Sequence, residues 1–182
     1  DARVVDKEDK QPRLWVLNVT TSETRALTPA TWRVSELDWA SAGDRIFVVA
    51  TDTPASDQLT DRIFGVAVSD GKMKQLAAPH GPFGRIQAAP DGKTLGYIGS
   101  REDGPDPHDL FLQPTTGGAP RNLTGASLDR PVFDYKWLKG GGVLTVAAIG
   151  FRNALVTYTE DGTRKDAGAL DTNPGPFAVS SS

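Results

Sequence analysis

A repeat of about 49 residues constrains the fold of this chain more than any other feature of its sequence. Apolar and glycine residues recur in matching columns at spacings of 47 to 49 residues: Trp39, Ala88 and Trp137; Gly43, Gly92 and Gly141; Ile46, Leu95 and Leu144; Leu37, Ile86 and Tyr135; Leu27, Leu76 and Leu123. Agreement between independent columns indicates tandem copies of one structural unit. Because such a unit buries its apolar faces against its neighbours, we expect a stacked, repetitive architecture.

The composition of each unit favours strands over helices. The chain of 182 residues has 19 glycines and 13 prolines, well above the usual share of about 12%. Dipeptides that accept positive φ in tight hairpins separate short runs rich in β-branched residues, such as 46–49 and 143–146. These dipeptides are Asp70-Gly71, Asp91-Gly92, Gly117-Gly118 and Asp161-Gly162. The sequence therefore predicts many short strands joined by tight turns.

Four antiparallel strands in a repeat of about 40–50 residues are typical of a β-propeller blade. A sandwich does not need a fixed period, and a helical solenoid would need helices. The sequence thus predicts an all-β protein, a partial β-propeller of about three to four four-stranded antiparallel blades. We expect Trp15, Trp39, Trp137 and Phe111 to pack between blades.

The repeat also predicts where the units begin and end. We place half a blade at 13–30, blades at about 33–77, 82–124 and 131–168, and the start of a next blade at 176–182. Propellers close with about 4–8 blades. We therefore expect 1–182 to be an incomplete propeller segment of a longer protein.

Charge and composition exclude several classes of partner. The 20 Lys and Arg residues against 23 Asp and Glu residues give a net charge of −3, which argues against nucleic acid or an anionic membrane surface as the main partner. No apolar run approaches the roughly 18 residues of a membrane-spanning helix. The absence of cysteine excludes disulfides and thiolate chemistry, but it does not identify the compartment.

Three segments of the repeat resemble a known family. Residues 89–95 read Ala-Pro-Asp-Gly-Lys-Thr-Leu, similar to the SPDGK-type turn of bacterial propellers, and 109–113 with 117–124 resemble the second half of that repeat. Residues 14–17 with 25–28 are another copy. The chain is similar to the N-terminal β-propeller of prolyl oligopeptidase-family serine peptidases, especially the acylaminoacyl-peptidase and dipeptidyl-peptidase branches. The periplasmic Tol-system propeller carries similar repeats.

The peptidase resemblance implies a propeller that covers an active site and limits entry to short peptides. Hydrolysis would use a Ser-Asp-His set in a C-terminal α/β-hydrolase domain. No Gly-x-Ser-x-Gly segment is present in this sequence, so no catalytic residue can be assigned here. The expected partners are that domain or the remaining propeller chain, together with a peptide substrate. The alternative is a non-enzymatic Tol-system-like propeller that binds a protein. The compartment stays open between bacterial cytoplasm and periplasm.

Long charged connections are expected at one end of the sheets. In an up-and-down sheet, the second-to-third connections and the crossings between blades lie opposite the tight turns, and here they are 51–61, 79–83, 100–108 and 125–131. Such loops carry recognition on a rigid scaffold. We expect this rim to meet the substrate or partner, with Arg62, Arg101, Arg130 and Arg152 as candidate contacts to anions or carboxylates.

No metal or cofactor is predicted. The two histidines, His80 and His108, lie in separate repeats, whereas a zinc site needs three or four convergent ligands. An acidic group could in principle offer oxygen ligands, but its spacing does not match a calcium loop. Its members are Glu102, Asp103, Asp106 and Asp109.

Overall fold

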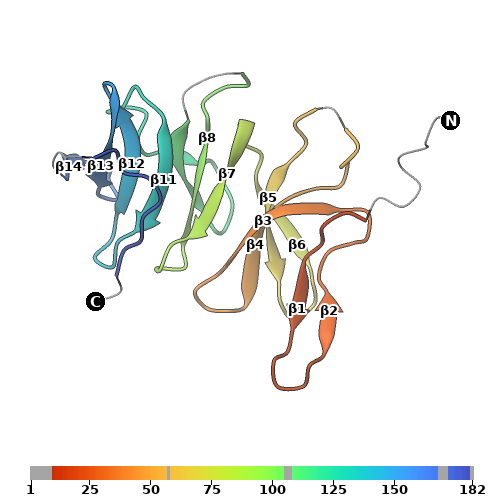
Figure 1. Ribbon diagram of the computed structural model, residues 1–182. Helices are drawn as coiled ribbons and strands as arrows, with labels where there is room; N and C mark the ends of the chain where they lie inside the picture. Colours follow the sequence, from red (N-terminus) through yellow and green to blue (C-terminus); the bar gives the residue numbers. More distant parts are fainter. Residues whose placement is uncertain (1–9, 57, 105–107, 168–171, 181–182) are drawn as a thin grey trace.

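The computed structural model describes residues 10–56, 58–104, 108–167 and 172–180. Within these residues all regular secondary structure is β-strand (Figure 1). The strands are β1 (Trp15–Leu17), β2 (Thr24–Ala26), β3 (Arg33–Trp39), β4 (Arg45–Thr51), β5 (Arg62–Ala67), β6 (Met73–Ala77), β7 (His80–Ala88), β8 (Thr94–Ser100), β9 (Asp109–Pro114), β10 (Arg121–Asn122), β11 (Val132–Trp137), β12 (Val143–Ile149), β13 (Arg152–Tyr158) and β14 (Arg164–Asp166).

The strands form three four-stranded antiparallel sheets and one hairpin. The hairpin is β1–β2, and the sheets are β3–β6 (blade 1), β7–β10 (blade 2) and β11–β14 (blade 3), each in simple sequential order. Figure 1 shows the three sheets side by side, as in part of a propeller. The predicted all-β fold and partial propeller are confirmed. Residues 172–180 form no strand, and 181–182 lie outside the described residues, so the next blade at 176–182 stays a prediction.

The core lies between the sheets and is divided into three apolar clusters. Successive side chains of a strand point to opposite faces, so Ile46 and Phe47 of β4 belong to different clusters. Leu14 and Val48 share the cluster between the hairpin and blade 1. Ile63 and Leu95 share the one between blades 1 and 2, and the third joins blades 2 and 3. Its buried members include Leu110, Leu112, Val132, Tyr135 and Val156.

Carboxylates of β3 hold the backbone of β7, the first strand of blade 2. Glu36 Oε2 accepts a hydrogen bond from the Ile86 N–H at 3.0 Å, and Asp38 Oδ2 accepts one from the Ala88 N–H at 2.7 Å. A Cβ at Gly84 would lie 2.5 Å from Glu36 Oε1, so a larger residue there would displace this carboxylate from its position. Blade 1 therefore binds blade 2 through the main chain as well as through apolar packing.

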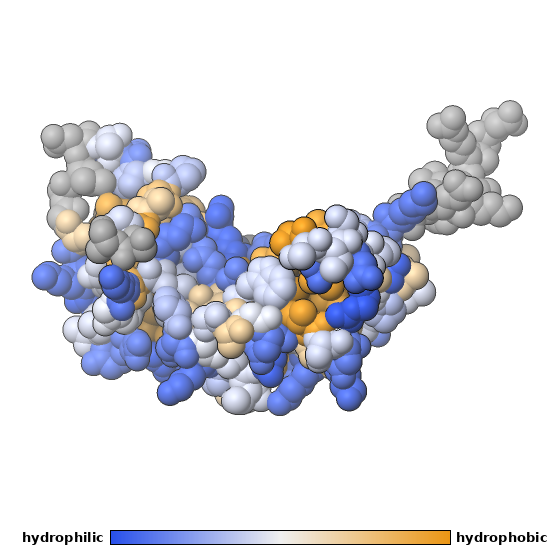
Figure 2. Space-filling model, turned by 90° about the horizontal axis from the view of Figure 1, so that it is seen from below, coloured by the Kyte–Doolittle hydropathy of each residue, from blue (hydrophilic) through white to orange (hydrophobic). Residues whose placement is uncertain are grey.

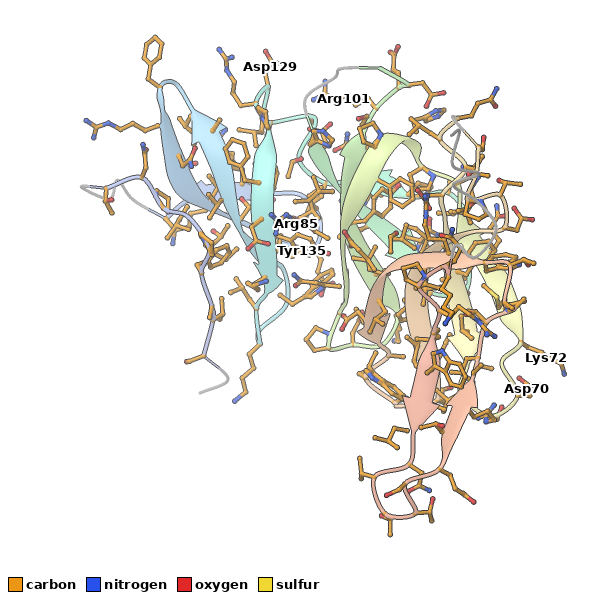
Figure 3. All side chains as sticks on the ribbon, turned by 45° about the vertical axis from the view of Figure 1, so that its right-hand side comes forward. Asp70, Lys72, Arg85, Arg101, Asp129 and Tyr135 are labelled. Carbon is orange, nitrogen blue, oxygen red and sulfur yellow. The ribbon has the colours of Figure 1, made fainter. Side chains whose placement is uncertain are left out.

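Side chains of β11 bind the same strand from the other side. Tyr135 Oη donates to the Arg85 carbonyl at 3.0 Å, and Trp137 Nε1 donates to the Gln87 carbonyl at 3.1 Å. Figure 3 shows Arg85 and Tyr135 next to each other between the two blades. The backbone of β7 is thus bonded on both sides by its neighbours.

The expected packing of four aromatic residues between blades holds for two of them. Trp137 and Phe111 are partly buried against the clusters between blades, and the Phe111 ring stacks on Tyr97 at 5.2 Å. For Trp15 and Trp39 the prediction is wrong, because they are 54% and 45% exposed. Trp39 faces the unit that precedes blade 1, and within the described residues this unit is the β1–β2 hairpin alone, on which Trp15 itself lies.

The two ends of the sheets differ as the turn pattern predicts. At one end, the turns after β3, β7 and β11 contain Gly43, Gly92 and Gly141, whose φ values are +72°, +69° and +90°. At the other end lie the described residues of two longer connections, 52–56 with 58–61 and 101–104 with 108 (Figure 1). The prediction of a loop at 79–83 is wrong, because most of this segment belongs to β7, where His80 pairs with Ser100.

Candidate functional site

The connections opposite the tight turns form a surface that we call the long-loop rim, made of the described residues 52–56, 58–61, 101–104, 108, 123–131 and 150–151. Figure 3 shows Arg101 and Asp129 at this end of the molecule. All four arginines predicted as contacts lie in these connections or directly beside them. Their surroundings differ, which divides them into two pairs.

Arg101 and Arg62 are bound to their own loops. Arg101 Nε donates to Asp109 Oδ2 at 2.5 Å, and the Asp109 side chain is fully buried. Asp109 Oδ2 also accepts a hydrogen bond from Asn122 Nδ2 at 2.6 Å. Arg62 Nη1 donates to the carbonyls of Leu59 and Asp61 at 3.2 and 2.7 Å. These contacts give both guanidinium groups a structural role in shaping the rim.

Arg130 and Arg152 are the accessible pair. Both are exposed, and within the described residues neither forms a hydrogen bond or an ion pair through its side chain. Arg130 lies in the crossing from blade 2 to blade 3, and Arg152 begins β13 after the short connection 150–151. They are the two predicted arginines that can meet an anionic group without first leaving a partner in this part of the chain.

A small pocket lies between blades 2 and 3 near the rim, and the sequence analysis missed it. Its volume is about 320 Å³, and its lining includes Phe83, Arg85, His108, Val132 and Phe133. We call it the rim pocket. The Phe133 side chain is exposed, and the Arg85 side chain is 58% exposed, with Nη1 3.6 Å from Asp134 Oδ1. The pocket therefore offers an aromatic surface beside a guanidinium group.

Arg85 has an unusual backbone conformation. Its φ is +55°, in the left-handed region that non-glycine residues rarely adopt, and the pairing of β7 with β8 is irregular between Gly84 and Gln87. Backbone strain of this kind persists only where surrounding contacts impose it. The sequence did carry a signal that could have drawn attention to Arg85. In the repeat column that holds Glu36, Arg85 and Asp134, the middle copy has an arginine where the other two have acidic residues.

Acidic and histidine side chains do not assemble into a metal centre. Among the described residues, no group of three or more His, Asp or Glu side chains could hold an ion. His80 Nδ1 lies 3.4 Å from Asp103 Oδ1, and this oxygen accepts the Gly81 N–H at 2.7 Å. The predicted acidic group also contains Glu102, Asp106 and Asp109. Of these three, Asp106 lies outside the described residues.

The tyrosines are unsuited to acid–base chemistry near neutral pH. Burial raises the pKa of Tyr135 and of Tyr97 well above the usual value for a phenol. Burial also raises the pKa of Tyr158. These three are the only tyrosines in the sequence. The three side chains therefore act in packing, and Tyr135 also donates a hydrogen bond to the Arg85 carbonyl.

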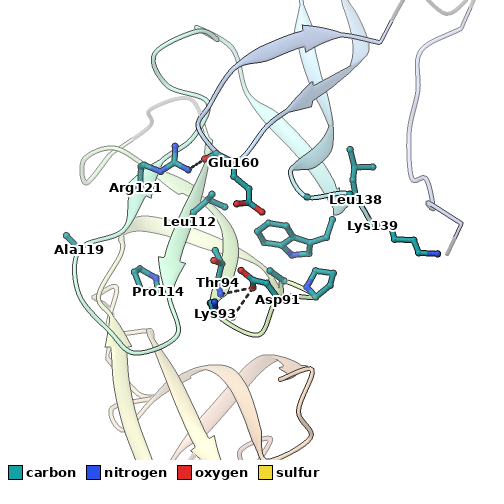
Figure 4. A pocket seen from close by; sticks show the side chains of 15 residues that line it. Asp91, Lys93, Thr94, Leu112, Pro114, Ala119, Arg121, Leu138, Lys139 and Glu160 are labelled. Atoms are coloured by element: carbon teal, nitrogen blue, oxygen red, sulfur yellow. Dashed lines mark hydrogen bonds between the residues drawn. The ribbon is translucent and has the colours of Figure 1, made fainter. Parts of the chain in front are cut away.

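A larger groove lies between blades 2 and 3 at the tight-turn end (Figure 4). Its volume is about 640 Å³, and we call it the seam groove. It is lined by Ala89, Pro90, Asp91, Lys93, Thr94, Leu112, Pro114, Ala119, Arg121, Trp137, Leu138, Lys139, Gly140, Gly141 and Glu160.

Apolar side chains are also exposed around β1 and β3. Trp15, Leu17, Leu37 and Trp39 are each about half exposed. Figure 2 shows apolar residues gathered on one part of the molecule, in a view along the sheets from the tight-turn end. Within the described residues, no helix is both long enough and apolar enough to cross a bilayer.

Comparisons with known proteins place the chain by its fold. No protein-family model and no curated protein matches it. A puromycin-hydrolyzing peptidase of Mycobacterium tuberculosis is similar with a TM-score of 0.67 at 15% identity, over 88% of this chain and 28% of that one. An oligogalacturonate lyase in complex with manganese gives 0.67 at 13% identity, over 88% and 49%. TolB of Acinetobacter baumannii gives 0.56 at 18% identity, over 84% and 36%.

These similarities confirm the propeller-type fold. The chain spans between about a quarter and a half of the length of these structures. At such low sequence identity the shared fold does not carry a shared activity, because one fold hosts many functions. Function has to be argued from the surfaces of this chain.

Proposed function

We propose that this chain is part of the propeller of a prolyl oligopeptidase-type serine peptidase, where it selects and positions short peptides. Bond cleavage would belong to an α/β-hydrolase domain C-terminal to it, and the contacts of the chain would be to that domain or to the remaining propeller. The observation that carries the proposal is the difference between the two ends of the sheets. Tight turns connect the strands at one end, whereas the accessible arginines and the rim pocket lie at the other.

The chemistry of the rim fits a peptide. Arg130, Arg152 and the half-exposed Arg85 can meet carboxylates, because a guanidinium group binds a carboxylate through two parallel hydrogen bonds. Phe133 and Phe83 offer apolar surface to a side chain of the peptide. The similarity to peptidase structures supports this choice among the functions that a propeller can host.

The first experiment asks whether the full-length protein is a serine hydrolase. A fluorophosphonate probe reacts with an activated serine, so the peptidase proposal predicts covalent labelling of the full-length protein. Absence of labelling in folded protein that also fails to hydrolyse short peptides would refute it.

The second experiment asks whether the rim selects substrate. Arg130→Glu and Arg152→Glu should change kcat/KM for peptides with an acidic residue at least about fivefold relative to neutral peptides, since each reverses a charge that the substrate meets. Lys165→Glu is the matched control, because Lys165 is an exposed residue of β14. If the rim variants behave like this control, selection by the rim is excluded.

The second candidate is a non-enzymatic propeller that binds a protein partner at the same rim. The similarity to TolB structures of Acinetobacter baumannii and Agrobacterium tumefaciens favours it. It predicts no fluorophosphonate labelling and a protein partner whose affinity falls in Arg130→Glu. The two proposals therefore separate on the labelling result.

A further inference from the structure

We call the space between two neighbouring blades a seam. Two cationic side chains close the seam between blades 1 and 2 at its tight-turn end. Arg45 Nη1 donates to the Thr115 carbonyl at 3.3 Å, and Lys74 Nζ donates to the Thr116 carbonyl at 2.8 Å. Arg45 lies against Gly65, where a Cβ would be 2.9 Å from Arg45 Cδ. A long side chain and the glycine that accommodates it therefore fill this seam.

The seam between blades 2 and 3 lacks one of these side chains. In the repeat, Thr94 takes the column of Arg45, and Leu112 takes the column of Gly65. Arg121 takes the column of Lys74 and still donates across the seam, to the Glu160 carbonyl. Because threonine cannot reach the next blade, the space stays open as the seam groove of about 640 Å³. This volume is within the range of about 300–1,000 Å³ of small-molecule sites.

Apolar groups line the interior of the seam groove. Leu112, Pro114, Trp137 and Leu138 contribute to it. Trp137 Nε1 already donates to the Gln87 carbonyl, so the rest of the indole offers apolar and aromatic surface to the groove. An aromatic ring can pack against this surface with little polar cost.

The charged groups of the groove favour an anion. Lys93, Arg121 and Lys139 contribute three positive charges, against the carboxylates of Asp91 and Glu160. Asp91 Oδ1 already accepts the backbone N–H groups of Lys93 and Thr94, at 2.8 and 3.2 Å. Figure 4 shows Arg121 and Lys139 on opposite sides of the groove. Since the positive charges outnumber the negative ones, the groove favours an anion over a cation.

We propose that the seam groove binds a small arylalkyl carboxylate, with its ring against Trp137 and Leu112 and its carboxylate toward Arg121 and Lys93. The site lies at the opposite end of the sheets from the long-loop rim, so it is independent of the proposed function. Ring and charge are both required, because the groove provides an apolar surface and an excess of positive charge.

The proposal is tested by calorimetric titration of the full-length protein with 4-phenylbutyrate. We expect saturable binding with one site per chain. Its amide, 4-phenylbutanamide, removes the charge, and butyrate removes the ring, so each should bind at least about tenfold more weakly. Equal affinity of acid and amide, or no binding of 4-phenylbutyrate, would overturn the proposal.

Two variants locate the binding. Thr94→Arg with Leu112→Gly rebuilds the closed arrangement of the first seam, and it should reduce affinity at least about tenfold while the circular dichroism spectrum stays native. Lys93→Glu leaves the core untouched, because Lys93 is exposed, and it should weaken binding at least about fivefold.

The matched control for the charge variant is Lys72→Glu. Lys72 is exposed in the β5–β6 turn of blade 1 and does not line the groove (Figure 3). It changes the net charge by the same amount and should leave affinity within about twofold. If Lys93→Glu binds as Lys72→Glu does, or a folded Thr94→Arg/Leu112→Gly variant keeps its affinity, the groove is not the site.

Discussion

Replacing Arg101 by alanine removes the counter-ion of a buried carboxylate. Asp109 is fully buried at the start of β9, whereas the Arg101 side chain is 38% exposed. In the variant Arg101→Ala the carboxylate keeps the hydrogen bond from Asn122 but loses the guanidinium group. The expected result is a large loss of stability, since the buried charge cannot move into solvent while blade 2 stays folded.

The size of the loss follows from these contacts. Removing one partner of a buried ion pair costs about 3–5 kcal/mol. We expect the lower end, about 3 kcal/mol, because Asn122 still donates to Asp109 and the guanidinium group is itself partly screened by water. For a chain of this size, about 2–4 °C per kcal/mol converts this into a fall in Tm of about 6–12 °C.

Urea unfolding followed by circular dichroism measures the change in the free energy of unfolding. Arg130→Ala is the matched control, because this exposed arginine should cost no more than about 0.5 kcal/mol. Adding Asp109→Asn to Arg101→Ala should restore at least about 1 kcal/mol, since the buried group is then neutral. The reasoning is refuted if Arg101→Ala costs as little as the control, or if Asp109→Asn restores nothing.

Two further predictions concern the turns and the tyrosines. Gly142→Ala should cost at least about 2 kcal/mol more than Gly117→Ala in urea unfolding. Both glycines have positive φ, but a Cβ at 142 collides with the Tyr158 carbonyl, whereas one at 117 meets nothing within 4 Å; equal costs would contradict this. All three tyrosines have a raised pKa in the folded chain, so their contribution to stability is complete below the unfolded pKa of about 10 and is lost as the pH rises toward the folded values. Tyrosinate absorbance should therefore appear together with loss of the strand signal, and a separate titration near pH 10 in folded protein would contradict it.

The sheets could be predicted because their determinants are local. Glycines at the turns and alternating apolar runs recur at a fixed spacing, and both signals act within a few residues of the chain. The exposure of Trp39 could not be predicted in this way. Its column is buried only where the inner strands of a preceding blade cover it, and the β1–β2 hairpin provides none within the described residues.

The surfaces were predictable in position but not in chemistry. Strand ends place Arg62, Arg101, Arg130 and Arg152 at the rim, yet the burial of Asp109, which binds Arg101, depends on the packing of blade 2 against blade 3. The seam groove results from a difference between repeat copies, a short residue in the column of Arg45. A comparison of the columns for side-chain length, as well as for polarity, would have found it.

The hydrogen bonds to β7 have a consequence for how such repeats diverge. Its neighbours bond to main-chain amide and carbonyl groups, which every residue except proline supplies in full. Apart from Gly84, whose missing side chain leaves room for Glu36, the side chains of β7 are not needed for these hydrogen bonds and can change while the contacts between blades persist. The surface residues of each repeat can therefore change independently, while the hydrogen bonds that join the blades, and with them the fold, are kept.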